Sequence, residues 1–229
     1  MNQKRNQLEK HIGITFKNKQ LLQNVFIHRS YLNEDRSFAI PSNEKLEFLG
    51  DSVLSLSTSI YLYHNYTELK EGDYTDIKAS IVRTESLAQV ARELALGQYL
   101  YLSRGEEKGI GRDKTNILAD LFEALIAAIF IDKGFDHAYD FIVKYLFSNR
   151  LDEIIQKKLY LSPKSRLQEI SQAKFKELPT YELVLAHGPE HKKAFTVHVL
   201  LNNAIMGSGS GRSKKHAEEK AAQNALDNL

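Results

Sequence analysis

The chain has 229 residues, of which 42% are hydrophobic and 26% are charged, with a formal net charge of +2 and no cysteine. This composition is typical of a globular protein of one or two domains, and the lack of cysteine excludes disulfides, thiolate catalysis and cysteine-ligated zinc sites. No apolar run approaches the roughly 18 residues of a membrane span, and the N-terminus has no signal-peptide hydrophobic region, so we expect a cytoplasmic protein with no membrane partner.

The first part of the chain, residues 2 to about 35, predicts two helices. Asn18 is a suitable N-cap for the second of them, and His28-Arg29-Ser30 would close it. His28 could be catalytic. A lone histidine at a helix end is more often a hydrogen-bonded structural group, and we favour that interpretation.

Three acids mark the next helix, which we expect to begin at Ser42 or Asn43. Glu44, Glu47 and Asp51 are spaced i, i+3 and i+7, so they line one face of the helix. Like charges at this spacing repel one another, and apolar neighbours reduce their solvation. The pattern therefore favours a bound cation, and a hard divalent ion is the natural candidate.

A second helix carries acids among apolar residues. Residues 116–130 are apolar almost all round, which predicts a buried helix, and Asp120 and Glu123 share one of its faces. Because charged residues are almost never buried unpaired, we expect this pair to meet the first acids and to complete a metal site. In the first acidic helix, Gly50 costs about 1 kcal/mol relative to alanine, which predicts close approach of another helix or of substrate backbone.

The remainder of the first part of the chain also predicts helices, so that an all-helical unit of roughly 155 residues results. The first acidic helix should end at about Tyr66. We then expect a helix from Glu71 to Arg83, a helix capped by Thr84 or Ser86 and ending at Gly97, a flexible basic loop over 103–114 that could contact phosphates, and helices over 136–148 and 150–158.

From Pro163 the pattern changes to alternation typical of strands, with Asn202-Asn203 as a turn. We expect a helix over 164–175, strands over 180–186, 194–201 and 203–207, and a helix over 212–228. A glycine-rich run precedes this last helix and brings lysines to its N-terminus, where free backbone N–H groups favour phosphate. Residues 162–229 contain ten Lys and Arg against seven Asp and Glu, a charge of +3.

Two of these segments resemble the ribonuclease III family. NEKLEFLGDS at 43–52 is similar to the signature of that family, ILADLFEALI at 117–126 is similar to its second acidic helix, and His28–Tyr31 and Glu71–Asp73 extend the resemblance. The resemblance implies an all-α endonuclease domain that hydrolyses double-stranded RNA with Mg²⁺, leaving 5′-phosphates and short 3′ overhangs, in the processing of ribosomal and other structured RNA. We expect Mn²⁺ to substitute for Mg²⁺.

The same resemblance assigns roles to individual side chains. It implies a homodimer, in which Phe48 is either a core residue or a seam residue that fills a pocket of the partner, and we expect the seam. It also implies that Glu44 and Glu71 make supporting contacts with RNA or water. The metal would be held by four acids, with Asp51 and Glu123 the most directly catalytic: Glu47, Asp51, Asp120 and Glu123.

The last part of the chain resembles a double-stranded-RNA-binding domain of α-β-β-β-α order. The predicted organisation is an endonuclease domain at 1–156, a linker at 157–161 and this small α+β domain at 162–229. In that family the first helix and the loop between the first two strands meet successive minor grooves, while lysines span the phosphates between them. The matching positions are Gln168, Gln172, Gly188, Pro189, His191, Ser213, Lys214 and Lys215.

Two other functions remain open. The first is a non-catalytic dimer that only binds double-stranded RNA, and the intact acids argue against it. The second is a nuclease for single strands or DNA, and the duplex-reading tail argues against that. One departure from the family concerns packing, because Ser55, Ser57 and Ser59 stand where such helices are usually more apolar.

Overall fold

The computed structural model describes residues 2–35, 37–148, 150–189 and 193–229, without the side chains of residues 2–5. The chain divides into two compact units, Met1–Ile155 and Gln156–Leu229, and each is described here by itself. Over the described residues, none of the helices is both long enough and apolar enough to span a membrane.

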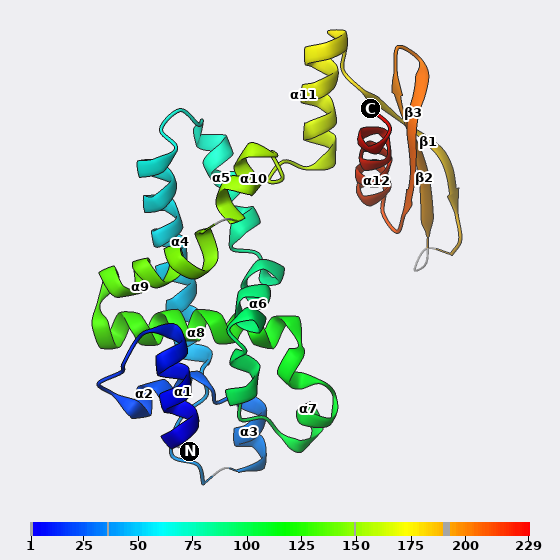
Figure 1. Ribbon diagram of the computed structural model, residues 1–229. Coiled ribbons are helices and arrows are strands. Elements are labelled where there is room, and N and C mark those ends of the chain that lie inside the picture. Colours follow the sequence, from blue (N-terminus) through cyan, green and yellow to red (C-terminus); the bar gives the residue numbers. More distant parts are fainter. Residues whose placement is uncertain (1, 36, 149, 190–192) are drawn as a thin grey trace. The chain divides into compact units, whose positions relative to one another are not determined.

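The first unit is built from helices, as predicted (Figure 1). Two short 3-10 helices, Leu96–Tyr99 and Gly111–Asp113, and a π-helical turn, Val143–Phe147, complete it. The α-helices are α1 (Asn2–Ile12), α2 (Lys19–Val25), α3 (Arg29–Glu34), α4 (Glu44–Asn65), α5 (Glu71–Ile81), α6 (Thr84–Glu93), α7 (Arg104–Lys108), α8 (Thr115–Lys133), α9 (Phe135–Ile142) and α10 (Arg150–Gln156).

Helix α8 runs through the middle of this unit and packs chiefly against α4 and α6 (Figure 1). Its apolar residues are buried on all sides, from Ile117 to Ile129, which confirms the prediction of a core helix. Burial of a large aliphatic or aromatic side chain contributes roughly 1.5–3 kcal/mol. The acids of α8 are therefore carried by a helix whose other residues are largely buried in the core of the unit.

The first 35 residues form three helices, so the prediction of two was wrong. The chain is extended at Ile27, which forms a parallel bridge with Tyr101, and this bridge separates α2 from α3. His28 does not close a helix but caps the start of α3, where its side chain accepts a hydrogen bond from the backbone N–H of Ser30. Asn18 caps α2 as predicted and accepts from the backbone N–H groups of residues 20 and 21.

The flexible basic loop predicted over 103–114 is instead the ordered helix α7 and a 3-10 turn. Two of its four cations are engaged within the segment: Arg112 pairs with Glu107, and Lys114 pairs with Glu106. Arg112 also donates to the carbonyl oxygens of Gly97 and Leu100. These bonds tie the segment to the end of the preceding helical region, so the sequence pattern overestimated its freedom.

Helix α6 begins at Thr84, with Arg83 at the N-cap position but without a side-chain capping hydrogen bond, and it ends at Glu93, before the predicted end at Gly97. Ala95 has a left-handed φ of 50°, which breaks the helix ahead of Gly97. Gly97 then lies in the following 3-10 helix. A Cβ on it would lie 2.2 Å from the Arg112 carbonyl oxygen, so close backbone contact explains this glycine better than helix termination.

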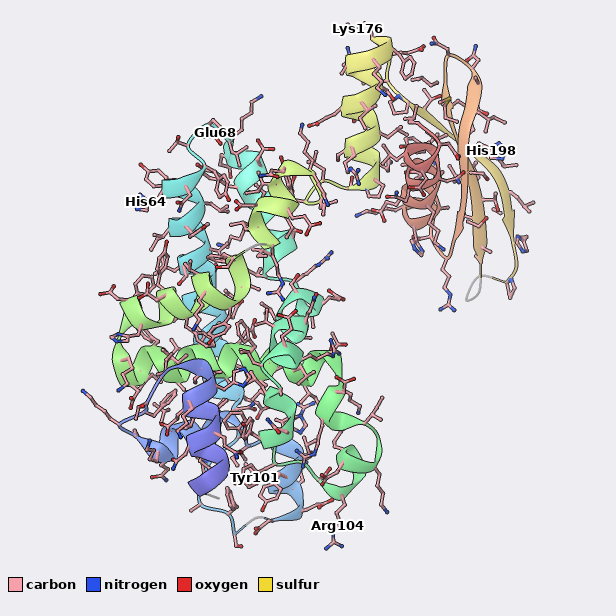
Figure 2. All side chains as sticks on the ribbon, in the orientation of Figure 1. His64, Glu68, Tyr101, Arg104, Lys176 and His198 are labelled. Carbon is pink, nitrogen blue, oxygen red and sulfur yellow. The ribbon has the colours of Figure 1, made fainter. Side chains whose placement is uncertain are left out.

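The second unit has the predicted α-β-β-β-α order and an antiparallel sheet in the strand order β1-β2-β3 (Figure 1). Residues of α11, β2 and α12, such as Leu167, Val197 and Ala221, form its core. His198 lies on the face of the sheet turned away from α12 (Figure 2). The elements are α11 (Pro163–Phe175), β1 (Thr180–His187), β2 (Ala194–Leu201), β3 (Ala204–Gly211) and α12 (Lys214–Asp227).

The third strand is longer than predicted, because β3 continues through the glycine-rich run to Gly211 and α12 starts at Lys214. The glycines of β3 face α12: a Cβ on Gly209 would lie 2.3 Å from the backbone nitrogen of Ala221. Glycine and alanine therefore bring strand and helix into contact at close range. The run is a packing surface of the sheet and not a loop.

Candidate active site

The two acidic helices meet at Gly50. A Cβ at this position in α4 would lie 1.9 Å from the carbonyl oxygen of Glu123 in α8, so only glycine permits the observed approach. The predicted close approach is thus that of another helix. It sets Glu47, one turn before Gly50, opposite the acidic face of α8.

The start of α4 is held by Asn43. Its backbone N–H donates to the carbonyl oxygen of Ile27 at 2.9 Å, and its buried side chain donates through Nδ2 to the carbonyl oxygen of Val25 at 3.0 Å. Asn43 occupies the predicted N-cap position, but its side chain does not cap the helix. It instead fixes the first turn of α4 against the segment that leads into α3.

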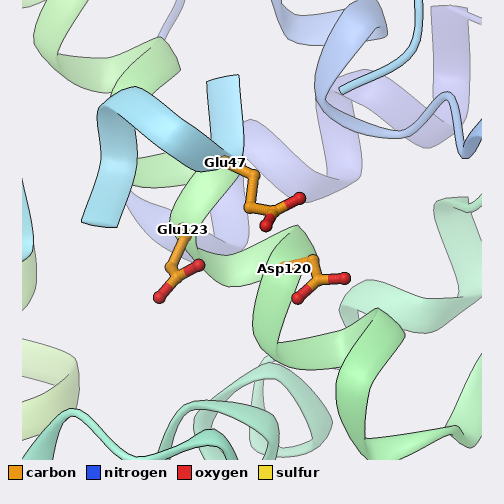
Figure 3. A group of neighbouring side chains, drawn as sticks. All are labelled: Glu47, Asp120 and Glu123. Atoms are coloured by element: carbon orange, nitrogen blue, oxygen red, sulfur yellow. The ribbon is translucent and has the colours of Figure 1, made fainter. Parts of the chain in front are cut away.

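Three carboxylates converge where these helices meet. One oxygen of each of Glu47, Asp120 and Glu123 lies within 4.8 Å of the others, and all three residues are partly buried. Glu47 projects from α4, and the other two project from α8 (Figure 3). Carboxylate oxygens are the ligands that hard divalent cations prefer, so this cluster could hold a metal ion.

The electrostatics of the cluster agree with a cation site. Burial raises the pKa of Glu123 to about 8, and the charges of Asp51, Asp120 and Glu47 add to the shift. Burial is also the main cause of the raised pKa of Glu47 and of Asp120. The protein alone therefore stabilises the charged cluster poorly, and a bound cation would supply the missing positive charge.

The remaining predicted acids lie outside this trio. Asp51 is exposed, and it is close enough for its charge to raise the pKa of Glu123. Glu44 pairs loosely with Arg29, at 3.7 Å between Oε1 and Nη1, and accepts a hydrogen bond from Ser42. The structure thus brings together three of the four predicted metal ligands, with the fourth beside them.

Glu71 is remote from the trio within one chain. It begins α5 and lines a pocket together with Tyr63 and His64, which belong to the C-terminal half of α4. Tyr63 follows Glu47 by sixteen residues, or about 24 Å along a helix. A single protomer therefore gives Glu71 no part in the cluster.

Sequence reasoning assigned no role to Arg29, the first residue of α3. Its charge opposes the upward pKa shifts of Glu47 and Asp120, so it lies near the acids of both helices. The signal in the sequence that could have identified Arg29 was its position in the His28-Arg29-Ser30 segment. His28 beside it has a lowered pKa, caused first by burial, and its Nδ1 lies 2.8 Å from the Ser30 hydroxyl oxygen, which agrees with a structural role.

Phe48 is 80% exposed, so it does not belong to the core of its own unit. Leu56 and Tyr63, on the same helix, are also exposed. These three residues are spaced by eight and seven positions, close to two helical turns each, so they form one apolar stripe along α4. We call the line Phe48, Leu56 and Tyr63 the α4 stripe.

The predicted RNA-binding positions of the second unit are exposed wherever they are described. Gln168 and Gln172 lie on α11, and Ser213 caps α12 by accepting a hydrogen bond from the backbone N–H of His216. Gly188, with φ of +96°, and Pro189 follow β1. His191 lies outside the described residues. Lys214 and Lys215 occupy the first positions of α12.

Comparisons with known proteins agree with both units. A family model described as Ribonuclease-III-like matches residues 18–150, and one described as Double-stranded RNA binding motif matches residues 163–229.

Relatives named Ribonuclease 3 match along nearly the whole chain. The protein from Pelotomaculum thermopropionicum is 42% identical over 219 residues, which cover 96% of this chain and 90% of the relative. The protein from Clostridium perfringens is 44% identical over 223 residues, or 97% and 93% of the two chains. The solved nuclease domain of ribonuclease III from Campylobacter jejuni aligns with a TM-score of 0.58 at 36% identity, over 62% of this chain and 96% of that domain. The convergent acids, the helical unit that carries them and these matches lead to one conclusion: the chain belongs to the ribonuclease III family.

Proposed function

We propose that the chain is a divalent-metal-dependent endoribonuclease that hydrolyses phosphodiester bonds in double-stranded RNA. The observation that carries this proposal is the convergence of Glu47, Asp120 and Glu123 within 4.8 Å in a member of the ribonuclease III family. Its second unit matches a double-stranded-RNA-binding motif, which supplies the preference for a duplex.

We propose Mg²⁺ as the resident ion, with Mn²⁺ as a substitute. The donor set fits Mg²⁺, because it consists of carboxylate oxygens without nitrogen or sulfur. The raised pKa of Glu123 agrees with a cation site, because the protein alone supplies too little positive charge to stabilise its ionised form. A bound divalent ion lowers the pKa of a water molecule and stabilises the charge that grows on the phosphate.

The acids of this chain have distinct parts in the proposed reaction. Glu47, Asp120 and Glu123 would hold the cation, and Asp51, which is exposed and near Glu123, would orient a water molecule or join the metal site once RNA is bound. No side chain needs to act as a nucleophile. We expect 5′-phosphate products with short 3′ overhangs, in the processing of ribosomal precursors and other structured RNA in the cytoplasm.

The second unit is proposed to read duplex shape. Gln168 and Gln172 on α11 and the segment that holds Gly188, Pro189 and His191 would meet successive minor grooves. Ser213, Lys214 and Lys215 would face the phosphates between the grooves, where the N-terminus of α12 adds its free N–H groups.

We propose a homodimer formed along the α4 stripe. A two-fold axis beside Leu56 would set Phe48 of one protomer against the region of Tyr63 of the other, because these two residues lie eight and seven positions from Leu56. That region contains a pocket of about 470 Å³ lined by Ser59, Tyr63 and Tyr74, among others. The short serine side chains of this face permit two helices to approach closely.

The same dimer would explain Glu71. This residue lines the pocket that would receive Phe48, and Phe48 follows Glu47 directly in the chain. The partner subunit's Glu71 would therefore lie near Glu44 and Glu47, where it could make the predicted supporting contact with RNA or water. In one protomer alone the position of Glu71 has no such use.

The test is the incubation of purified protein with long duplex RNA, the separated single strands and duplex DNA, each with Mg²⁺ and with chelator. We expect Mg²⁺-dependent cleavage of duplex RNA alone. Duplex binding without cleavage would favour the non-catalytic dimer, and cleavage of single strands or DNA would reject the duplex-RNA specificity.

A further inference from the structure

Arg29 lies at one edge of the acidic cluster. Its Nη1 is 3.7 Å from Oε1 of Glu44, and the two side chains are 72% and 53% exposed. Glu44 stands one helical turn before Glu47. An exposed ion pair of this length adds little to folding stability. The stability of the fold therefore does not account for a guanidinium at this position.

The backbone that carries Arg29 is fixed on two sides. Asn43, at the start of α4, donates to the carbonyl oxygens of Val25 and Ile27. On the other side, the N–H of His28 donates to the carbonyl oxygen of Tyr101 at 3.2 Å. These bonds place the backbone of Arg29 beside the first turn of α4, and its side chain is largely exposed.

The cluster has a cationic edge and an anionic edge. The charge of Arg29 opposes the burial that raises the pKa of Glu47 and of Asp120. At Glu123, burial is the largest cause of the raised pKa, and the negative charge of Asp51 is the second largest. An RNA strand crossing the three carboxylates would thus meet positive charge on the side of Glu47 and Asp120.

We propose that Arg29 binds a phosphate of the RNA strand adjacent to the scissile phosphate and leaves Glu44 when the duplex enters. A guanidinium offers five N–H donors in a planar fork that matches two phosphate oxygens, and Arg29 uses only the loose pair with Glu44 among the described residues. Arg29 is then a positioning residue, which sets the register of the strand over the acids. This inference rests on the proposed function.

The experiment compares full-length Arg29→Ala and Arg29→Lys with Arg83→Ala, which removes an exposed arginine at the N-cap of α6. Duplex affinity is measured in Ca²⁺ over a range of salt concentrations, and cleavage is measured in Mg²⁺ at saturating RNA. We expect Arg29→Ala to weaken binding roughly tenfold at low salt and to reduce the slope of log K against log salt by about 0.7–0.9, the loss of one phosphate contact.

Arg29→Lys should keep the salt slope, because its charge remains, but should cleave more slowly than the parent at saturating RNA, because the fork is lost. Arg83→Ala should behave as the parent, and all three variants should melt like it. If Arg29→Ala binds duplex with the parent's affinity and salt slope while the parent cleaves, the inference is wrong and Arg29 only balances the charge of the acids. A parent that neither binds nor cleaves duplex RNA would instead overturn the proposed function itself.

Discussion

The backbone of Glu123 lies against Gly50 with no room for a side chain between them, since a Cβ on Gly50 would be 1.9 Å from the Glu123 carbonyl oxygen. The contact with Gly50 therefore fixes the backbone position of Glu123, the acid of the cluster whose pKa is raised to about 8. The geometry of the metal site and the packing of α4 on α8 are therefore one feature of the fold.

Gly50→Ala should separate the two helices and weaken the site. Backbone atoms cannot yield as a flexible side chain can, so we expect an overpacking cost of about 1–3 kcal/mol, less the gain of about 1 kcal/mol that alanine brings to a helix. Metal affinity and cleavage should fall further than stability, because Glu123 moves with its backbone. Denaturant unfolding, metal titration and cleavage of duplex RNA would measure the three effects.

The matched control is Gly72→Ala in the first turn of α5, where an added Cβ meets nothing within 4 Å. It should leave stability unchanged or raise it by up to about 1 kcal/mol. If Gly50→Ala behaves like Gly72→Ala, the close approach of α4 and α8 does not set the site.

Phe48→Ala should weaken the dimer. An aromatic anchor that fills a pocket commonly contributes 2 kcal/mol or more to association, about a thirtyfold change in the dimer constant. The folding of each protomer should be unaffected, because Phe48 is 80% exposed in it. Sedimentation would measure the change, with Ile131→Ala, an exposed apolar residue of α8, as the control. A dimer constant unchanged by Phe48→Ala would remove this residue from the proposed seam.

Deletion of Ser162–Leu229 should weaken duplex binding and make cleavage more sensitive to salt, but should leave activity at low salt. The convergent acids all belong to the first unit, and the deleted segment carries ten Lys and Arg. Cleavage assays over a salt series would test this. A truncated protein that is folded yet inert at low salt would show that the second unit takes part in catalysis.

The sequence could predict the acidic helices because each has acids at helical spacing among apolar residues. This pattern is unfavourable in most structures unless the acids bind a cation. It also predicted a close approach at Gly50, although not whether a helix or substrate would make it, and the α-β-β-β-α order of the second unit. It could not predict that the Gly207–Gly211 run continues a strand, because this depends on the alanine face of α12, which lies later in the chain.

Long-range bonds account for the other errors. The bridge between Ile27 and Tyr101 ends a helix that local propensity would have continued, and Arg112 orders a segment whose glycines suggested a loop. The position of Glu71, far from the trio in one protomer, also had no local signal. Local sequence patterns therefore predicted which acids form the site, whereas the elements that surround the site depend on contacts between residues distant in sequence.

Glu123→Gln separates the chemistry of the site from folding. The change keeps volume and a carbonyl oxygen but removes one charge from a hard-cation site, so metal affinity should fall and cleavage should drop by at least about 10²- to 10³-fold. Duplex affinity in Ca²⁺ should persist or increase, because a negative charge that faces phosphate is gone and the second unit is unchanged. Glu68→Gln, which removes an exposed glutamate at a distance from the cluster, should cleave as the parent does.

The raised pKa of Glu123 predicts that the stability of the metal-free protein depends on pH, and Glu123→Gln tests this. The pKa of Glu123 is raised from 4.5 to about 8 in the folded state, so between these values the folded protein binds more protons than the unfolded chain. Stability without metal should therefore decrease as pH rises from 4.5 to 8, because the unfolded chain ionises this carboxyl group while the folded protein still holds its proton. Glu123→Gln should lose much of that decrease and should melt above the parent at pH 8 in chelator, but close to it at pH 5.

Saturating Mg²⁺ should raise the melting temperature of the parent at pH 8 and should raise that of Glu123→Gln less, because the cation favours the ionised carboxylate. A variant that melts below the parent at pH 8 in chelator would show instead that Glu123 is required for folding, and its loss of cleavage would then say nothing about the metal.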